Sequence, residues 1–429
     1  TNDRRQRQMC IRDSQKIEQI RSQVKHHDWS ADICHDATIE DLSRDAIIKA
    51  RTEFLKKYVD KPQKVAEIEN WDDVTFLNKT RAAKRGMITN AAMLLLGKSE
   101  SDYLLSPAIG NISWFLKTEA NESLGYEHFS IPFILASTKV YNKIRNLRYR
   151  YIADNTLFPT ETTRYDAYVI REVLHNCIAH QDYSLRTRIN VVEKPEELIF
   201  TNAGEFIPGS VENVIRMDTP PDFYRNQHLA TLMVQYGMID TEGGGIKKIF
   251  QTQKNRFFPL PDYDLSMTNK VKVIILGRII DPNYTRLLTQ QTDLTLDTTM
   301  LLDRIQKGKS VKTENVKQLR TEKLIEGRKP NYYVADQIAA VTRQKAAYIK
   351  NRAFDTKYYK DLVLEFLKKN KTASREEIDD LLTNKLSDVL NATQKKGKIK
   401  NILYQMSAMD KSIYNAGSRT KPAWQIVPN

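Results

Sequence analysis

The chain has 429 residues, of which 41% are hydrophobic and 28% are charged, and its formal net charge is +14. This composition excludes a chain that is disordered throughout, and its 15 Gly and 14 Pro exclude a collagen-like or low-complexity architecture. The longest apolar runs, such as residues 93–96 and 273–276, are far shorter than the ~20 residues that cross a bilayer, so we expect no membrane association.

The cysteines indicate a reducing compartment. Cys10, Cys34 and Cys177 are too few to build a disulfide framework, and no Cys-x-x-Cys pair suggests a zinc site. No basic-then-apolar stretch at the start of the sequence is typical of a signal peptide. We therefore expect a cytoplasmic protein with reduced thiols.

Positive charge is concentrated near the end of the chain. Residues 341–429 hold 18 Lys and Arg against 9 Asp and Glu, a net charge of +9 within the total of +14. Localised basicity of this kind favours a polyanionic partner, most often nucleic acid. A solvated basic face without a partner is the alternative.

The first part of the chain is expected to be helical. Residues 1–14 show no periodicity, and we interpret them as a non-native or disordered leader, with the natural N-terminus missing. Residues 15–84 are predicted to form a helical N-terminal segment, the tail of a domain that is otherwise absent. Apolar residues at three- and four-residue spacing in residues 39–58 predict a helix there. A short buried element is expected to end at Gly97.

A mixed pattern of strands and helices follows in residues 85–282. We predict strands at 111–118, on both sides of Lys194-Pro195 and at 270–279. The predicted helices are a basic one over 137–151, one over 166–184, one ending at Gly237 and one starting at the glycine run 243–245.

Beyond residue 282 the pattern changes to compact helical modules. In residues 283–335 we predict helices near 295–305 and 312–324 and a hairpin over 327–335. Residues 336–356 are a basic linker. In residues 357–429 we predict a helix over 357–370, a capping box from Ser374 to Glu377 that opens a second helix, a basic third helix over 394–409 and a β-wing.

The most informative segment for chemistry is REVLHNCIAHQDYS. Glu172 and Asn176 are four residues apart, so both side chains project from one face of the predicted helix. Further along, Gly243, Gly244 and Gly245 precede another helix. Backbone N–H groups at such a positive helix end suit a phosphate. A glycine run alone is weak evidence, but the ordered set of motifs is stronger.

The segments REVLHNCIAHQDYS, IFTNAGEFIPG, RNQ and EGGGIKKIF, in this order, resemble the ATP-binding module known as the RecG-like C-terminal domain. That module belongs to the superfamily of gyrase, heat-shock chaperone, histidine-kinase and MutL ATPases (GHKL). Such proteins usually carry an N-terminal Schlafen AlbA-type domain, which we expect to be absent here apart from its tail, and C-terminal winged helices. The resemblance covers about residues 85–429. It implies an α+β fold, a GHKL (Bergerat-like) α/β sandwich over 85–282 followed by two winged-helix modules.

The resemblance also implies roles for residues that match the motifs. Asn176 would coordinate the Mg²⁺ that bridges the phosphates of ATP, and Glu172 would be the general base that polarises the attacking water. Asn202 stands where the superfamily usually has the Asp that reads the adenine amino group. The remaining nucleotide contacts implied are Gly204, Gly243, Gly244 and Gly245.

Two departures from the superfamily pattern bear on hydrolysis. Asn202 lacks a carboxylate charge, although its carbonyl can accept a hydrogen bond from the adenine amino group. Residues 205–243 contain no long glycine-rich lid. The resemblance therefore implies nucleotide binding more strongly than it implies hydrolysis.

Several residues near the predicted helix allow more than one interpretation. His180 lies about 80° around the helix from Glu172 and could approach the nucleotide. His180 and Asp182, in the order His-x-Asp, would suggest a metal pair but lack a third ligand at metal-site spacing, and helix-end packing is the alternative for them and for His175. Arg225 and Asn226 would make structural or phosphate-side contacts. Cys177 lies on the apolar face and is expected in the core.

The C-terminal modules resemble the winged helices that close this family. In such a fold the third helix enters the major groove and the wing contacts phosphate. Lysines of the predicted third helix and basic residues of the wing would then contact DNA: Lys395, Lys396, Lys398, Lys400, Arg419 and Lys421. A winged helix that binds protein is the alternative. In the first module Arg328 and Lys329 would be wing contacts, or this module would mediate dimerisation.

Three functions are compatible with these patterns. The first is an ATP-binding and DNA-binding regulator, in which a GHKL-like nucleotide site controls DNA engagement by the winged helices. Many GHKL modules dimerise on ATP, so a homodimer is expected by analogy. The second is a slow Mg²⁺-dependent ATPase in DNA processing or phage defence. The third is a non-enzymatic adaptor with a degenerate nucleotide site.

Overall fold

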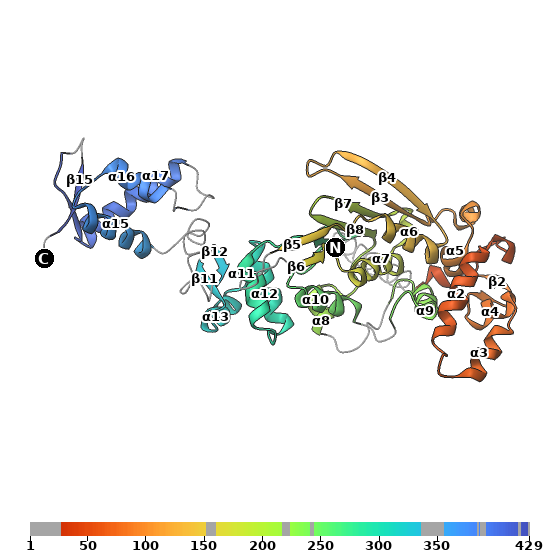
Figure 1. Cartoon of the computed structure of the whole chain (residues 1–429). Helices are drawn as coiled ribbons and strands as arrows, with labels where there is room; N and C mark the ends of the chain where they lie inside the picture. Colours follow the sequence, from red (N-terminus) through yellow and green to blue (C-terminus); the bar gives the residue numbers. More distant parts are fainter. Residues whose placement is uncertain are drawn as a thin grey trace, which may run out of the picture. The chain divides into compact units, whose positions relative to one another are not determined.

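The computed structural model describes residues 27–151, 160–216, 224–240, 244–335, 356–383, 386, 392–418 and 422–427. The chain divides into two compact units, Thr1–Ile279 and Ile280–Asn429. Figure 1 shows the helices and strands of each unit. Within the part of the chain that the structure describes, no helix is both long enough and apolar enough to cross a bilayer.

The first unit begins with short helices. Ser43 caps helix α2 (Arg44–Lys56), whose buried residues Ala46, Ile47, Ala50 and Phe54 form one face at helical spacing. This confirms the helix predicted within 39–58. The short element expected before Gly97 is helix α5, and all of its residues are buried. The other elements here are η1 (Trp29–Ala31), η2 (Ile39–Asp41), α3 (Pro62–Glu69), α4 (Asp73–Lys79), β1 (Ala83–Lys84), β2 (Met87–Ile88), α5 (Asn90–Leu96) and η3 (Ser99–Leu105).

A mixed six-stranded sheet forms the centre of this unit, in the order β4-β3-β7-β8-β10-β9. Strands β3 and β7 are parallel and the other neighbouring pairs are antiparallel. The strands predicted at 111–118, around Lys194-Pro195 and at 270–279 are confirmed as members of this sheet. Its strands are β3 (Asn111–Lys117), β4 (Ser123–Ser130), β7 (Ile189–Glu193), β8 (Glu197–Ala203), β9 (Asp262–Asp264) and β10 (Lys270–Leu276).

Helices cover one face of this sheet. Buried and partly exposed residues alternate along β7 and β10, as expected for strands with one covered face. Val191, Phe200 and Val273 are paired across three strands and all are buried. Figure 1 shows α6 and α7 beside the sheet, and α7 packs on β8. The helices of this part are α6 (Phe133–Lys143), α7 (Ala167–His180), η4 (Tyr183–Leu185), α8 (Val211–Arg216), α9 (Gln227–Gln235) and α10 (Gly245–Asn255).

One predicted helix is shorter than expected. The basic helix predicted over 137–151 ends at Lys143, and Arg148–Tyr151 is strand β5, paired with β6 (Thr160–Thr163). Asn146 has a positive φ of 38°, and its amide exchanges two hydrogen bonds with the backbone of Tyr165, at 2.9 and 3.0 Å. This tertiary pairing overrides the helical preference of the local sequence.

The second unit contains helices followed by short strands, twice along the chain. The helices and the hairpin predicted in residues 283–335 are confirmed, as are the three helices predicted beyond residue 356. Ser374 and Glu377 form the predicted capping box, with hydrogen bonds of 2.7 and 3.2 Å. The elements are α11 (Pro282–Gln290), α12 (Leu296–Gln306), α13 (Thr313–Thr321), β11 (Ile325–Arg328), β12 (Asn331–Val334), α15 (Thr356–Asn370), β13 (Ala373–Ser374), α16 (Arg375–Thr383), α17 (Ala392–Tyr404), η5 (Gln405–Met409), β14 (Ile413–Asn415) and β15 (Ala423–Ile426).

A contact between distant residues ties the start of the described chain to α9. Asp28 Oδ2 accepts a 2.7 Å hydrogen bond from the backbone N–H of His228, and the hydroxyl of the buried Ser30 accepts one of 3.0 Å from Leu229. These N–H groups belong to the first turn of α9 and have no partner within the helix. Residues about 200 positions earlier therefore cap α9, which lines the cavity described below.

We predict that Asp28→Ala loosens the first turn of α9. Loss of a helix cap costs about 0.5–2 kcal/mol, so the amides of His228 and Leu229 should exchange with solvent roughly tenfold faster. Hydrogen exchange followed by mass spectrometry measures this. Asp60→Ala, at an exposed position of the same unit, is the control, and equal exchange in the two variants would show that Asp28 does not act as the cap.

Candidate nucleotide site

Helix α7 presents the two polar residues singled out in the sequence. Asp166 caps the helix by accepting hydrogen bonds from the N–H groups of Tyr168 and Val169. The apolar face of the helix is buried against the sheet and its neighbours. Glu172 and Asn176 lie one turn apart, and the amide Nδ2 of Asn176 donates to Glu172 Oε1 over 3.4 Å. The predicted placement of these two residues on one helix face is thus observed.

The glycine turn before α10 lies directly against Glu172. Gly244 has a φ of +76°, a conformation that favours glycine, and α10 begins at Gly245. A Cβ placed on Gly245 would lie 1.9 Å from Glu172 Oε1, so any other residue would displace this carboxylate. Gly243, the third glycine of the predicted loop, lies outside the described residues. The first turn of α10 therefore faces the Glu172–Asn176 pair.

These elements enclose a cavity of about 290 Å³, near the lower end of the ~300–1,000 Å³ range of small-molecule pockets. Its wall is largely apolar, with a few converging polar groups. Of the predicted nucleotide residues, six line this one cavity: Glu172, Asn176, His180, Asn202, Gly244 and Gly245. The apolar part of the wall includes Val173, Cys177, Phe206, Ile207, Ile239, Val271 and Val273.

Burial makes Glu172 a stronger base than an exposed glutamate. The side chain is 6% exposed, and burial raises its pKa above the usual value, reinforced by the negative charge of Asp240. The hydrogen bond from Asn176 and the charge of Lys248 act in the opposite direction and are outweighed. A glutamate in this state is suited to accept a proton.

Sequence reasoning did not single out Lys248, Asp240 or Tyr168. Lys248 Nζ lies 3.3 Å from Asp240 Oδ2 and 4.8 Å from the centre of the Tyr168 ring. Asp240 lines the cavity, and Lys248 is in the first turn of α10. The two lysines that follow the glycine run, at 247 and 248, were a signal that a basic group accompanies the turn.

Asn202 is held in a fixed orientation at the end of β8. It is 4% exposed, and its Nδ2 donates to the carbonyl of Ala203 at 3.0 Å and to that of His180 at 3.4 Å. Because both bonds use the amide nitrogen, the carbonyl Oδ1 is left as the acceptor. The residue is thus fixed for recognition of a hydrogen-bond donor.

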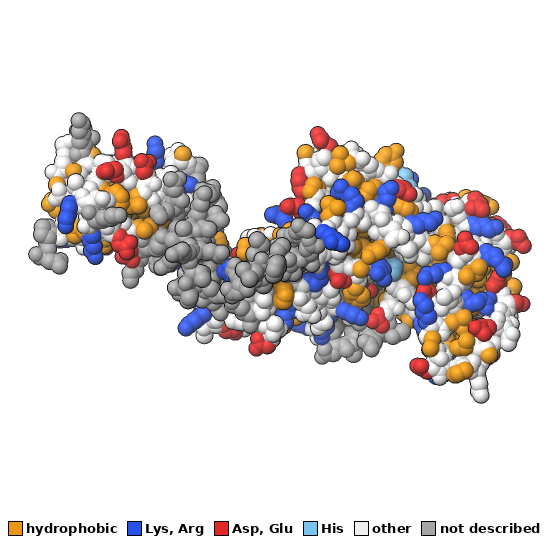
Figure 2. All heavy atoms as spheres, viewed as in Figure 1, with side chains coloured by type: hydrophobic (Ala, Val, Ile, Leu, Met, Phe, Trp, Pro, Cys, Tyr) orange, Lys and Arg blue, Asp and Glu red, His pale blue; other side chains and the backbone are white. Residues whose placement is uncertain are grey.

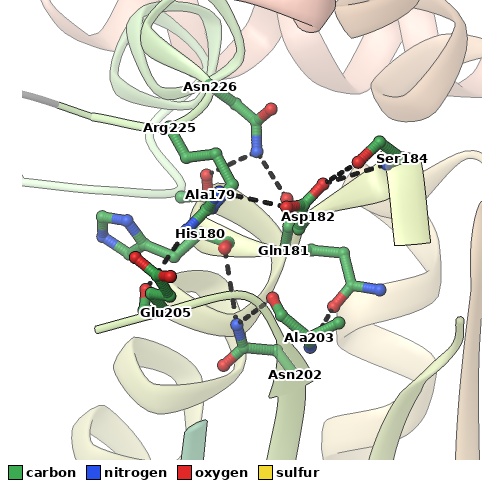
Figure 3. A network of polar contacts seen from close by, with 10 residues as sticks. All are labelled: Ala179, His180, Gln181, Asp182, Ser184, Asn202, Ala203, Glu205, Arg225 and Asn226. Carbon is green, nitrogen blue, oxygen red and sulfur yellow. Dashed lines mark hydrogen bonds and ion pairs between the residues drawn. The ribbon is translucent and has the colours of Figure 1, made fainter. Parts of the chain in front are cut away.

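Gly204 does not line the cavity but shapes its rim. Its φ is +113°, and an added Cβ would lie 3.0 Å from Arg225 Nε. Arg225 thus lies over this glycine. It pairs with Asp182 at 3.1 Å and donates to the carbonyl of Glu205 at 3.3 Å (Figure 3). The Asn-x-Gly turn and the Arg-Asn pair are therefore parts of one polar network.

Asn226 and Gln181 complete this network. Asn226 Nδ2 donates to the carbonyls of Ala179 and Gln181, at 2.9 and 2.8 Å, at the end of α7. The side chain of Gln181 in turn accepts from the N–H of Ala203 at 2.8 Å, as Figure 3 shows. The sequence predicted either structural or phosphate-side contacts for Arg225 and Asn226, and the contacts observed here are structural.

The histidines of α7 are partly buried and its cysteine is buried. Burial lowers the pKa of His175 and of His180 to about 4, and Arg225 adds to the effect at His180. The ring of His180 stacks on Tyr224 with centroids 5.8 Å apart. Cys177 is 2% exposed, as expected for a core residue, and burial raises its pKa to about 12. In the described residues, no group of three or more His, Cys, Asp or Glu is arranged to hold a metal ion.

The four lysines predicted to contact DNA all lie on α17, but packing divides them. Lys396 and Lys400 are exposed and one turn apart. Lys395 donates to the carbonyl of Thr383 at 3.4 Å, and Lys398 lies 5.3 Å from the centre of the buried Tyr359 ring. Burial lowers the pKa of Lys398. Arg419 and Lys421 lie outside the described residues.

Comparison with known families supports an ATPase-type module. Residues 187–275 match the family described as "Putative ATP-dependent DNA helicase recG C-terminal". The matched range runs from just before β7 to one residue short of the end of β10, so it includes Asn202 and the glycine turn but not Glu172 or Asn176. Residues 18–109 match a domain of unknown function, DUF8451. A similarity to a RecG-like, ATPase-type family is thus established, on a mixed α+β fold with a central mixed sheet.

No curated protein matches the chain. One similar solved structure is the DIP2311 protein from Corynebacterium diphtheriae, with 15% sequence identity and a TM-score of 0.49. The alignment covers 94% of this chain and 70% of that protein.

We predict that Glu172→Gln stabilises the protein, and increasingly so as the pH rises. Near pH 4, about the usual pKa of Glu, the wild-type carboxyl is protonated and the two proteins should be equally stable. Because the folded-state pKa is raised, ionisation of the buried carboxyl costs the wild type stability as the pH rises. The difference in stability between the variant and the wild type should therefore grow until the pH passes that pKa. Urea midpoints from pH 4 to pH 8 measure this difference. Glu119→Gln, at an exposed position, is the control, and a stability difference that shrinks as the pH rises would refute the burial argument.

Proposed function

We propose that this protein binds ATP with Mg²⁺ in the cavity between α7 and α10, and that the bound nucleotide controls DNA binding by the second unit. The observation that carries the proposal is the contact of Glu172 with Gly245, beside Asn176. It brings a carboxylate, a carboxamide and the positive start of a helix to one end of an apolar cavity. The match of residues 187–275 to an ATPase-type family supports it.

The residues present fit the proposed ligands. The apolar wall suits the adenine ring, and Oδ1 of Asn202 would accept a hydrogen bond from its amino group. The N–H groups at the start of α10 and the ammonium group of Lys248 suit phosphate oxygens. Asn176 would supply one oxygen to Mg²⁺, an ion that keeps several waters and takes its remaining ligands from phosphates.

Slow hydrolysis of ATP is a second candidate activity, and the state of Glu172 favours it. Its raised pKa suits a general base. It also contacts Gly245 at the start of α10, where the phosphates would bind. Glu172 would orient a water and take up its proton as that water attacks the γ-phosphorus, while the bond from this phosphorus to the bridging oxygen breaks and ADP leaves. Magnesium would neutralise charge on the phosphates.

We predict that Asn176→Ala and Glu172→Gln separate binding from hydrolysis. Asn176→Ala should weaken ATP·Mg²⁺ binding by about tenfold or more, because the ion then has one ligand fewer. Glu172→Gln should retain binding but lower phosphate release by about 100-fold. Calorimetric titration and a phosphate-release assay measure the two effects.

Asn213→Ala, a change on α8 outside the cavity wall, is the matched control. Equal binding by Asn176→Ala and wild type would refute the site. If Glu172→Gln released phosphate as fast as the wild type, Glu172 would not be the catalytic base, and only the nucleotide-binding role would remain.

DNA binding is assigned to the helical modules of the second unit. We take α15, α16, α17 and the strands β14 and β15 as a winged helix, with α17 as the helix that enters the major groove. The exposed side chains of Lys396 and Lys400 lie on one face of α17 and suit adjacent phosphates. The net charge of +9 in residues 341–429 supports a polyanionic partner.

We predict that Lys396→Ala and Lys400→Ala each weaken DNA binding and reduce its salt dependence. Removing one lysine–phosphate interaction should lower the slope of log K against log salt by about 1. Mobility shifts or fluorescence anisotropy at several salt concentrations measure the slope. Lys368→Ala, an exposed position on α15, is the control. No binding by the wild type at low salt would favour the adaptor instead.

A further inference from the structure

A second cavity lies on the other side of α7. Its volume is about 410 Å³, and it is lined by residues of α2, α6 and α7 and by the turn after α9. None of its lining residues is shared with the first cavity. Neither the motifs in the sequence nor the proposed function accounts for it.

Three helices each turn a polar face toward this cavity. On α6 the lining residues follow the i, i+3, i+4, i+7, i+8 spacing of a single helix face: Ile134, Ser137, Thr138, Tyr141 and Asn142. A helix face that packs against neighbouring helices is normally apolar, yet four of these five residues are polar. Lys49, Glu53 and Lys56 line it from α2, and Arg171 and His175 from α7.

The charges of the lining favour an anion. Lys49, Lys56 and Arg171 stand against the single carboxylate of Glu53. Glu53 is held by both lysines, at 2.7 and 2.9 Å, and its side chain is only 16% exposed. The exposed Arg171 lies 4.9 Å from the centre of the Tyr141 ring, which places it at the edge of the cavity. In Figure 2, Lys and Arg side chains are visible over the region where α2, α6 and α7 meet in Figure 1.

Backbone forms the remaining wall. Gly237 has a φ of +68°, and a Cβ there would lie 3.3 Å from Glu53 Oε2. His175 makes a hydrogen bond to the backbone of the neighbouring Met238. The chain thus passes close to the charged groups, which gives the cavity a fixed wall between the helices.

We propose that this cavity is a second binding site, separate from the nucleotide site, for a small phosphate-bearing molecule. Arg171 and the two lysines would bind the phosphate oxygens, and the polar face of α6 would bind the rest of the molecule through hydroxyl and amide groups. Glu53 positions the lysines and limits the net charge of the site.

Calorimetric titration of the full chain with inorganic pyrophosphate, without Mg²⁺, tests the proposal. Wild type should bind pyrophosphate, and Arg171→Gln and Lys49→Gln should each weaken it by about tenfold or more, because each removes a charge-assisted hydrogen bond. Lys64→Gln is the matched control, since Lys64 also pairs with a glutamate, Glu67, at 2.7 Å but lies outside the cavity.

Lys248→Gln separates this site from the nucleotide site, because Lys248 lies outside the second cavity and is the residue assigned to phosphate oxygens in the first, with or without Mg²⁺. If pyrophosphate binding persists in Lys248→Gln but is weakened about tenfold or more in Arg171→Gln, the second site stands, whether or not ATP binds in the first. Binding that is weakened in Lys248→Gln and unchanged in Arg171→Gln would assign the pyrophosphate to the first cavity and overturn the proposal. Absence of binding to the wild type would overturn it as well.

Discussion

The close approach of α10 to α7 is the constraint on which the candidate site depends. The Glu172 carboxylate occupies space that a side chain on Gly245 would need, so the two helices can meet here only with glycine at that position. The approach removes the carboxylate from water, which raises its pKa, while the positive end of α10 offsets part of the cost. The same helix end is also the natural place for a phosphate. A basic carboxylate and a phosphate-binding helix start thus arise from one packing interaction.

The motifs that are separate in the sequence are linked by hydrogen bonds to backbone groups. Asn226 holds the last carbonyls of α7, Asn202 holds the carbonyl of His180, and Gln181 holds the N–H of Ala203. Arg225 lies over Gly204, whose backbone conformation leaves room for it. Buried networks of this kind are rigid when their members are paired. The role of these residues is therefore to fix the end of α7 against β8, which places Asn202 at the wall of the cavity.

The parts of the fold that could be predicted from the sequence depend on local signals. Gly237 ends α9 with a φ of +68° and Ser374 forms its capping box with Glu377, because both interactions involve residues a few positions apart. The pairing of Asn146 with Tyr165 could not be predicted, since it joins residues that local periodicity does not connect. The same limit applies to the lysines of α17. Their spacing is visible in the sequence, but only packing shows that Lys398 lies against Tyr359 while Lys396 and Lys400 remain exposed.

Helix α7 has to satisfy opposing demands, because it forms a wall of both cavities. Its polar residues Arg171 and His175 line one cavity, while Glu172 and Asn176 line the other. By burying the carboxyl group of Glu172, the helix gives up stability that an apolar residue at the same position would supply. The helix must therefore be held by other means. Asp166 caps its start, Val169, Ile170, Val173 and Leu174 bury its apolar face, and Asn226 binds the carbonyls at its end. Polar residues that lower the stability of a helix, together with neighbouring contacts that compensate for the loss, are typical of a segment that serves binding rather than stability.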